Sequence, residues 1–192
     1  DYKPTIETDK GIKAKSKRGD FVKNWWATRW IAAMERVMDR GRLQRGRTYA
    51  RKGQVLSLEE GKGQIKAKVQ GSQRTPYKVT IELTSLSEKD WAKVLAALAE
   101  RPYFVAQLLA GEMPQEIEEA FQAAKLELFP GRRELKQHCN CPDSAAVCKH
   151  LAAVHYILAE RFDEDPFLMF RLRGKKQEEI LASLGTGEDE LE

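Results

Sequence analysis

The sequence predicts an α+β protein, because segments of helical periodicity surround one block of short alternating strands. Apolar side chains recur at helical spacing in residues 21–41, at a period of two in residues 54–83, and at helical spacing again after residue 87. With 192 residues and 42% hydrophobic content, the chain is long enough to bury a core as one domain or two small ones.

Composition and chain-breaking residues predict four parts along the chain. Residues 1–20 are polar, rich in lysine and without an apolar period, which predicts a basic flexible arm. Residues 21–130 are expected to form an α+β domain with a helix, a β-meander and further helices. Residues 131–184 follow the break at Pro130-Gly131 and are expected to form a cysteine-containing finger with C-terminal helices. The acidic tail 185–192 is expected to be disordered.

The N-terminal helix is predicted to start at Phe21 and to stop at Gly41. Its face is marked by side chains at helical spacing, which are Trp26, Trp30, Ala33 and Val37. Core packing is the favoured role of Trp26 and Trp30, and a platform for stacking bases is the alternative. Trp25 points in another direction and is the tryptophan that we expect to be more exposed.

A three-stranded antiparallel meander is predicted next. The segments QVLSLEE, QIKAKVQ and YKVTIEL are separated by Gly61-Lys62-Gly63 and by GSQRTP at 71–76. One face of the second and third strands is apolar, and it carries Ile65, Ala67, Val69, Val79, Ile81 and Leu83. Lys66 and Lys68 alternate with these residues, so we expect one buried face and one basic face.

A helical middle part follows the strands. Helices are predicted over 88–100, with Ser87 as the N-cap, and then around 103–110 and 114–125. A longer helical period begins after Cys148, in KHLAAVHYILAERF, and a last helix is predicted near 176–184.

All three cysteines fall within the segment HCNCPDSAAVCKH. An odd number of cysteines beside a histidine favours a metal site over a disulfide framework. The candidate ligands are Cys139, Cys141, Cys148 and His150. Three thiolates and one imidazole are a tetrahedral set for zinc, and with four protein ligands no position remains for a catalytic water. Free buried thiols, a redox pair and a catalytic cysteine with a histidine are the alternatives.

Local geometry supports this ligand set. If residues 139–141 are extended, both thiols lie on one side of the chain, because residues two apart share a side. The second pair lies where a helix begins, and the helix N-terminus and Lys149 would offset the net negative charge of the site. His138 is expected to point away from the site. His155 lies on the apolar face of its helix, and a core role is favoured over a ligand role.

The pattern Cys139-x-Cys141, six residues and Cys148-x-His150 resembles the SWIM zinc finger, whose motif is CxCx(n)CxH. The segments FVKNWWATRWIAAME, RGRTYARKGQVLSLE, VQGSQRTPYKVTIEL and DPFLMFRLRG resemble the bacterial SWIM zinc finger proteins, so the similarity covers about residues 21–184. The resemblance implies the same four zinc ligands. It also implies binding to DNA or to proteins and an association with helicases of the SNF2 type.

Charge is divided unevenly along the chain. Residues 1–80 carry 20 lysines and arginines against 8 acidic residues, whereas residues 81–192 carry 13 against 21. The first part is suited to a polyanion. The candidate nucleic-acid contacts are Arg40, Arg42, Arg45, Arg47, Tyr49, Arg51, Lys52, Lys66, Lys68 and Lys149. The alternative is a solvated charge run, or one that pairs with the acidic second part.

Three functions are compatible with these observations. The first is a zinc-binding accessory factor that contacts DNA, or else RNA, together with an SNF2-type helicase. The second is a zinc-stabilised protein-interaction module that does not touch nucleic acid and docks through the acidic helices at 88–127 and the C-terminal helix. An enzyme is not expected, since the chain has no GxxxxGK[ST] loop, GxSxG elbow or HExxH motif. Without an apolar run of membrane length, we expect a soluble, cytoplasmic protein.

Overall fold

The computed structural model describes residues 3–143, 145 and 147–189, and its contacts divide the chain into two compact units. Unit 1 comprises Asp1–Glu82 and Lys136–Asp165, and unit 2 comprises Leu83–Leu135 and Pro166–Glu192. Each unit therefore combines two separate stretches of chain. These bounds differ from the predicted parts, because the cysteine segment joins the sheet and helices of unit 1 instead of standing beside them.

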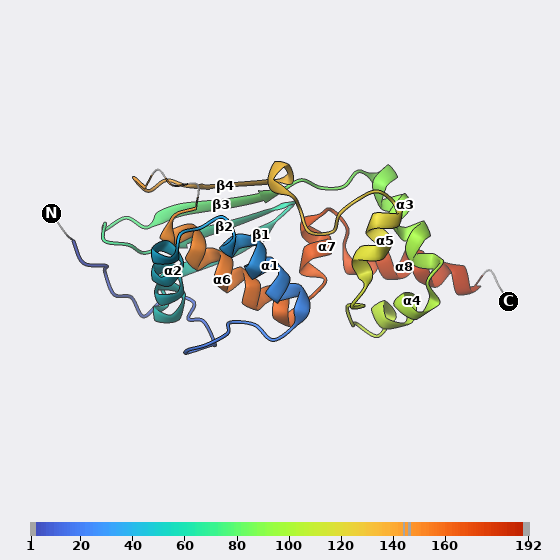
Figure 1. Cartoon of the computed structure of the whole chain (residues 1–192), viewed down its shortest axis with the longest axis horizontal. Coiled ribbons are helices and arrows are strands. Elements are labelled where there is room, and N and C mark those ends of the chain that lie inside the picture. The colour runs from blue at the N-terminus through green and yellow to red at the C-terminus, as the bar shows by residue number, and fades with distance from the viewer. Residues whose placement is uncertain (1–2, 144, 146, 190–192) are drawn as a thin grey trace. The chain divides into compact units, whose positions relative to one another are not determined.

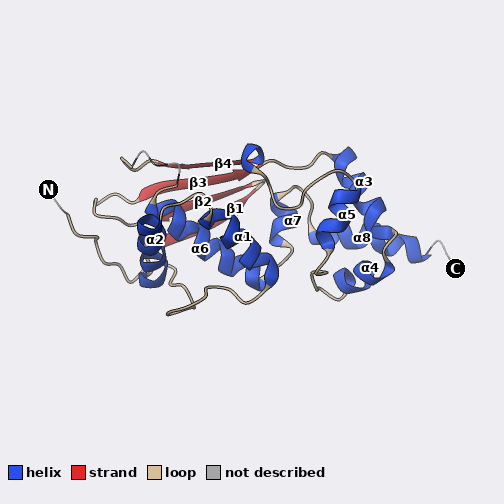
Figure 2. Ribbon diagram, in the orientation of Figure 1, coloured by secondary structure: helices blue, strands red, loops and turns tan. Residues whose placement is uncertain are grey.

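Unit 1 contains a four-stranded antiparallel sheet with a helical layer on one face (Figures 1 and 2). The strands, in sheet order, are β1 (Val55–Gly61), β2 (Gln64–Val69), β3 (Tyr77–Leu83) and β4 (Leu135–Cys139). Helix α6 (Lys149–Glu164) packs on β1 and β2, and α1 (Trp25–Glu35) and α2 (Arg40–Lys52) pack on α6. The α+β class is confirmed.

The alternating pattern determines which face of the sheet is buried. Ile65 pairs with Ile81 and Ala67 pairs with Val79, and all four side chains are at most 4% exposed. Because successive side chains point to opposite faces, the lysines between them point away from this core. The predicted meander is confirmed for β1, β2 and β3.

The fourth strand corrects the prediction of three. Strand β4 lies beside β3, with hydrogen bonds from the Asn140 amide to the Lys78 carbonyl (3.2 Å) and from the Thr84 amide to the Glu134 carbonyl (2.8 Å). The segment LKQHC is short and has no β-branched residue, so local propensity does not identify it. Its pairing with β3, 62 residues away at Asn140 and Lys78, stabilises it as a strand.

The predicted N-terminal helix is two helices. Helix α1 ends at Glu35, and the Asp39 carboxylate accepts a hydrogen bond from the Arg42 amide (2.8 Å), which begins α2. Gly41 therefore lies inside α2 and does not stop a helix. The buried face of α1 consists of Ala27, Trp30 and Met34. Two predicted face residues, Ala33 and Val37, are exposed instead.

Helix α2 approaches α6 closely because Gly46 has no side chain. A Cβ atom at Gly46 would lie 2.5 Å from the Cβ atom of Ala152 on α6. The contact places the first turn of α6, and with it His150, beside Tyr49 of α2. The segment that holds seven of the ten candidate nucleic-acid contacts is thus a packed helix.

The N-terminal segment, predicted to be flexible, lies against unit 1 in the part that the structure describes. Ile12 forms an isolated bridge with Val55, and the Ile6 amide donates to the Gly71 carbonyl (3.0 Å). Near its end, the Lys15 amide donates to the Glu160 carboxylate (3.0 Å). The segment is held in place by hydrogen bonds of its backbone to the sheet and to α6. Its polar composition alone does not predict this ordered conformation.

Unit 2 is helical. Its elements are α3 (Glu88–Ala99), α4 (Pro102–Leu109), α5 (Ile117–Ala123), the 3₁₀ turn η1 (Arg132–Glu134), α7 (Leu168–Leu172) and α8 (Gln177–Asp189). The Ser87 hydroxyl accepts a hydrogen bond from the Asp90 amide (3.0 Å), which confirms the predicted N-cap. Trp91, Phe121 and Phe170 meet at ring-centroid distances of 5.9–6.1 Å and form the centre of the unit. Helix α8 continues to Asp189, into the predicted tail, whose last residues 190–192 lie outside the described residues.

Candidate metal centre

The four predicted ligands come together in unit 1. Cys139 is the last residue of β4, Cys141 lies two residues beyond it, and Cys148 and His150 lie at the start of α6. Their ligand atoms all lie within 4.8 Å of one another. The Cys148 thiol also caps α6, since its Sγ accepts a hydrogen bond from the Leu151 amide (3.4 Å). The cluster therefore links the fourth strand to the main helix of the unit.

The spacing of the ligand atoms suits a tetrahedral zinc ion. Sγ of Cys139 and Sγ of Cys148 lie 3.7 Å and 3.8 Å from Nδ1 of His150. Zinc–sulfur bonds of about 2.3 Å and zinc–nitrogen bonds of about 2.0 Å place neighbouring ligands about 3.5–3.8 Å apart in a tetrahedron. Nδ1 of His150 is thus the nitrogen that faces the thiols, and the donor set fits zinc.

Aromatic rings hold the His150 side chain in place. The ring centroids of Tyr77 and Tyr49 lie 4.6 Å and 5.6 Å from that of His150. Nε2 of His150 is buried without a hydrogen-bond partner among the described residues. Gly71 makes this packing possible, because a Cβ atom there would lie 2.7 Å from the Tyr77 ring and 3.3 Å from Nε2 of His150.

The thiols perturb one another strongly because they lie close together. The hydrogen bond from Cys139, with further contributions from His150 and the Leu151 amide, lowers the pKa of Cys148 to about 4 against the effect of burial. The same hydrogen bond raises the pKa of Cys139, and burial raises that of Cys141. Without an ion, these shifts favour one thiolate beside two protonated thiols. A bound divalent cation would favour three thiolates, because its positive charge stabilises them.

An ion pair joins Asp143, two residues after Cys141, to Arg42 of α2. Nε and Nη2 of Arg42 donate to the two carboxylate oxygens of Asp143, each at 2.8 Å. Asp143 also accepts a hydrogen bond from the Ala145 amide (3.1 Å). The hydrogen bond from Arg42 lowers the pKa of Asp143 to about 2, and the two carboxylates near Arg42 raise its pKa. A bidentate pair fixes orientation, so Arg42 holds Asp143, which follows the first ligand pair, against α2.

Other members of the predicted nucleic-acid surface are also used within unit 1. Arg47 donates to the Tyr156 hydroxyl (2.9 Å), and Arg51 donates to the Gly19 carbonyl (2.7 Å). Tyr49 is 6% exposed and its hydroxyl hydrogen-bonds to Thr5 (2.7 Å). The buried Tyr49 ring has no free face for a base.

The remaining predicted contacts lie on different faces of unit 1. Three of them are exposed around α2, namely Arg40, Arg45 and Lys52. Lys66 and Lys68 are exposed on the sheet face that α6 does not cover. Lys149 is half-buried, with Nζ 5.3 Å from the centroid of the Tyr49 ring. The structure therefore does not bring the α2 residues and the strand lysines together on one surface.

The other two histidines lie outside the ligand cluster. His138 is exposed on β4, on the side opposite to Cys139. His155 is 2% exposed, contacts Trp30, and forms a hydrogen bond of 2.6 Å between Nε2 and Oε1 of Gln137. Burial lowers the pKa of His155 to about 4, so the ring is neutral at pH 7. The expectation of a core role for His155 is confirmed.

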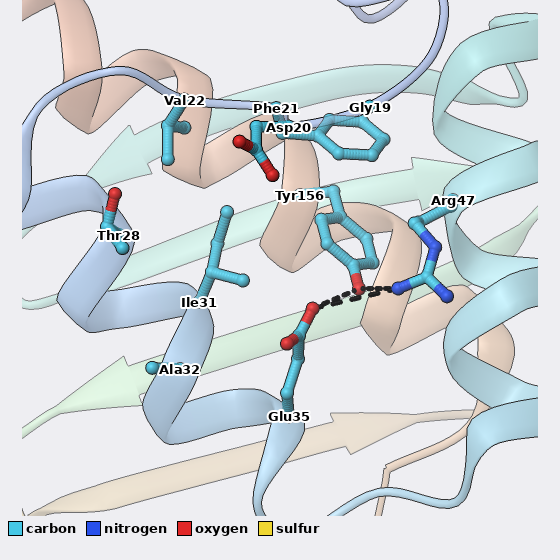
Figure 3. Close-up of a pocket in the computed structure, with 10 residues that line it drawn as sticks. All are labelled: Gly19, Asp20, Phe21, Val22, Thr28, Ile31, Ala32, Glu35, Arg47 and Tyr156. Atoms are coloured by element: carbon cyan, nitrogen blue, oxygen red, sulfur yellow. Dashed lines mark hydrogen bonds and ion pairs between the residues drawn. The ribbon is translucent and has the colours of Figure 1, made fainter.

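Unit 1 also contains a pocket of about 330 Å³ that the sequence does not reveal (Figure 3). Its apolar wall includes Phe21 and Ile31, and its polar groups include Glu35, Arg47 and Tyr156. These three groups bond to one another: the Tyr156 hydroxyl donates to Glu35 (3.0 Å), and Arg47 lies 3.6 Å from the same carboxylate oxygen. Burial, together with the hydrogen bond to Glu35, raises the pKa of Tyr156 to about 12. The mutual pairing gives these groups a structural role.

Comparisons with known proteins identify one relative. The chain is 50% identical over 175 residues to the uncharacterized protein Rv2102 of Mycobacterium tuberculosis (strain ATCC 25618 / H37Rv). The matched region covers 91% of this chain and 63% of the relative, so the chain spans less than two thirds of that protein's length. No family model and no solved structure matches the chain. In the described part of the chain, no helix has the length and apolar character to cross a membrane.

Proposed function

We propose that this protein is a SWIM-type zinc protein in which one Zn²⁺ ion is bound by Cys139, Cys141, Cys148 and His150. The observation that carries the proposal is the convergence of three thiols and one imidazole nitrogen within 4.8 Å. Bound zinc would supply a structural cross-link between β4 and α6, with all four positions taken by protein ligands. The role that follows is stabilisation of a binding surface and not catalysis.

The proposed binding partner is DNA, as part of an accessory factor that acts with an SNF2-type helicase, and RNA is a second candidate polyanion. The charge distribution supports this, since residues 1–80 contain 20 of the 33 lysines and arginines. Exposed cations on unit 1 would contact phosphates without reading bases. Because such contacts release counterions from DNA, the affinity should fall steeply as the salt concentration rises.

The test combines metal analysis with fluorescence anisotropy on labelled DNA across a salt series. We expect one zinc per chain and binding that weakens as salt increases. The Cys141→Ser variant removes one ligand and is expected to lose metal and thermal stability, whereas Ser72→Ala, outside the ligand set, is expected to keep both. Full zinc content in Cys141→Ser would contradict the metal site, and no DNA binding at low salt would contradict the DNA role.

One observation favours a second candidate, the protein-interaction module. Helix α4 in unit 2 exposes a row of apolar side chains, in which Tyr103 is 72% exposed and Leu109 is 42% exposed. Exposed aromatic side chains are enriched at protein interfaces. This candidate predicts that Tyr103→Ser weakens capture of a purified SNF2-type helicase and leaves DNA binding unchanged. Equal binding of the helicase to the wild type and to Tyr103→Ser would contradict the protein-interaction module.

A further inference from the structure

We propose that the sheet face opposite α6 is the surface on which the phosphate backbone of double-stranded DNA docks. This inference rests on the proposed DNA-binding function and assigns that function to one face of unit 1. The face, here called the open sheet face, is defined by Lys66 and Lys68 of β2, Lys78 of β3 and Lys136 of β4.

Within the described part of unit 1, the helices pack on the other side of the sheet and leave the lysines of the open sheet face exposed. Helix α6 packs on the apolar face formed by Ile65, Ala67 and their neighbours. Lys66, Lys68 and Lys78 alternate with these buried residues and are all exposed. With about 3.4 Å per residue along a strand and about 4.8 Å between strands, their Cα atoms lie within one small area.

The four lysines of this face outnumber its two glutamates, and Lys66 lies directly opposite one of them, Glu59 of β1. Lys68 pairs directly with Lys78 across β2 and β3, and like charges in directly opposed positions destabilise a sheet. The other neighbour of Lys68 is Ser57 of β1, which carries no charge. Two glutamates, Glu59 and Glu82, share the face with the four lysines, yet none of these lysines forms an ion pair with any described residue.

The arginines of α2 differ in this respect. Arg42 and Arg47 form ion pairs with Asp143 and Glu35, and Arg51 is held by the Gly19 carbonyl and lies 4.4 Å from the centroid of the Phe21 ring. Their guanidinium groups would have to leave these partners to bind phosphate. The lysines of the open sheet face would lose no such partner, and a phosphate between Lys68 and Lys78 would relieve their repulsion.

The side chains of the face also indicate which nucleic acid it accepts. Proteins that bind single strands without sequence preference stack bases on exposed aromatic rings. Tyr77, the aromatic residue of the described strands, packs its ring against His150 on the apolar side. A face of lysines whose strands carry no exposed phenylalanine, tyrosine or tryptophan suits the backbone of a duplex, where contacts go to phosphates.

The test compares two matched triple variants by anisotropy on a labelled DNA duplex across a salt series. The first is Lys66→Gln, Lys68→Gln and Lys78→Gln. The second is Lys89→Gln, Lys93→Gln and Lys176→Gln, three exposed lysines of unit 2. Each variant loses three positive charges from the formal net charge of +4, so a difference between the two reports position and not total charge.

We expect the first variant to bind about tenfold more weakly or worse at low salt. The slope of log affinity against log salt should fall by about 2.7, because each lost phosphate contact removes about 0.9. The unit 2 variant should retain the wild-type slope. Circular dichroism and zinc content report folding. If the first variant misfolds, the double variant Lys68→Thr with Lys78→Thr replaces it, because threonine suits exposed strand positions.

Three results would overturn the inference. If the open-face variant binds like the wild type while Arg40→Gln with Arg45→Gln loses affinity, the DNA site is on α2 and the proposed function stands. If single-stranded DNA binds in preference to the duplex, the assigned occupant is wrong. If the wild type fails to bind DNA at low salt, both this inference and the proposed DNA-binding function are wrong.

Discussion

Two histidines on α6 show how position along one helix determines the chemistry of a residue. His150 lies in the first turn, where its Nδ1 faces two thiols at 3.7 Å and 3.8 Å. His155 lies five residues later, on the side of α6 that packs against Trp30 of α1. Its Nε2 forms a hydrogen bond with Gln137 of β4. One ring is thus placed for a metal and the other fills the core.

The buried His155 makes stability depend on pH. Its pKa is about 4 in the folded protein, below the value of about 6.5 expected in an unfolded chain. The unfolded state therefore binds more protons between these values, so stability is complete above pH 6.5 and is lost as the pH falls toward 4. The loss attributable to this ring is about 3 kcal/mol, from about 1.4 kcal/mol per pKa unit.

Urea unfolding of the wild type and of His155→Gln between pH 7 and pH 4 measures this effect. Glutamine keeps a donor to Gln137 but does not titrate, so the free energy of unfolding should fall less steeply in the variant. Protonation of the metal ligands at acid pH affects both proteins alike and cancels in the comparison. Equal pH slopes for the two proteins would show that His155 is not the source.

At the scale of elements, a buried arginine joins the separate segments of unit 2. Arg173 follows α7 and is 0% exposed, and its Nη2 donates to the Glu127 carbonyl and pairs with the Glu134 carboxylate, each at 2.8 Å. Nη1 donates to the Thr84 carbonyl. The Trp91 indole in turn donates to the Arg173 carbonyl (3.0 Å). One side chain thereby connects the ends of β3, α5, η1 and α7.

Replacing Arg173 with methionine should destabilise the protein by about 3 kcal/mol, at about 1 kcal/mol for each hydrogen bond lost. The substitution fills similar volume but leaves the Thr84 and Glu127 carbonyls and the partly exposed Glu134 carboxylate without their donor. Lys93→Met, on the exposed side of α3, is the matched control and should change stability by about 0.5 kcal/mol or less. The two free energies come from urea unfolding, and similar values for both variants would contradict a structural role for Arg173.

At the scale of the whole molecule, the metal centre lies where unit 1 is completed by a second stretch of chain. Residues 136–165 return to a unit begun by residues 1–82, and they contribute both β4 and α6. Cys139 and Cys141 belong to the strand end, whereas Cys148 and His150 belong to the helix start. An ion bound there would hold the strand end and the helix start together and would stabilise unit 1 in particular.

Chelation of the metal should therefore loosen the two units unequally. Hydrogen exchange measured by mass spectrometry, with and without chelator, is expected to increase in β4, in the first turn of α6 and in α2, which packs on α6. Peptides from α3 and α5 in unit 2 serve as internal controls and should change little. An equal increase across both units would mean that the ion stabilises the chain as a whole.

The local sequence by itself determined the elements with strong periodicity, the faces of β2 and β3, and the ligand quartet. Helical and strand periods are properties of neighbouring residues, and the short CxC and CxH spacings bring their thiols and imidazole together as soon as a strand and a helix form around them. The start of α2 is also determined locally, by the N-cap Asp39. The prediction missed it because apolar residues continue at helical spacing from α1 to Val37.

Only the tertiary structure decided the conformation and the interactions of residues whose partners are distant in sequence. Strand β4 exists through pairing with β3, and the N-terminal segment is ordered through bonds to Val55 and Glu160. Arg42 and Tyr49 resemble phosphate and base contacts in the sequence, but they bind Asp143 and pack on His150. The physical reason is that charge and aromaticity are local properties, whereas the partner that satisfies them is chosen by long-range packing.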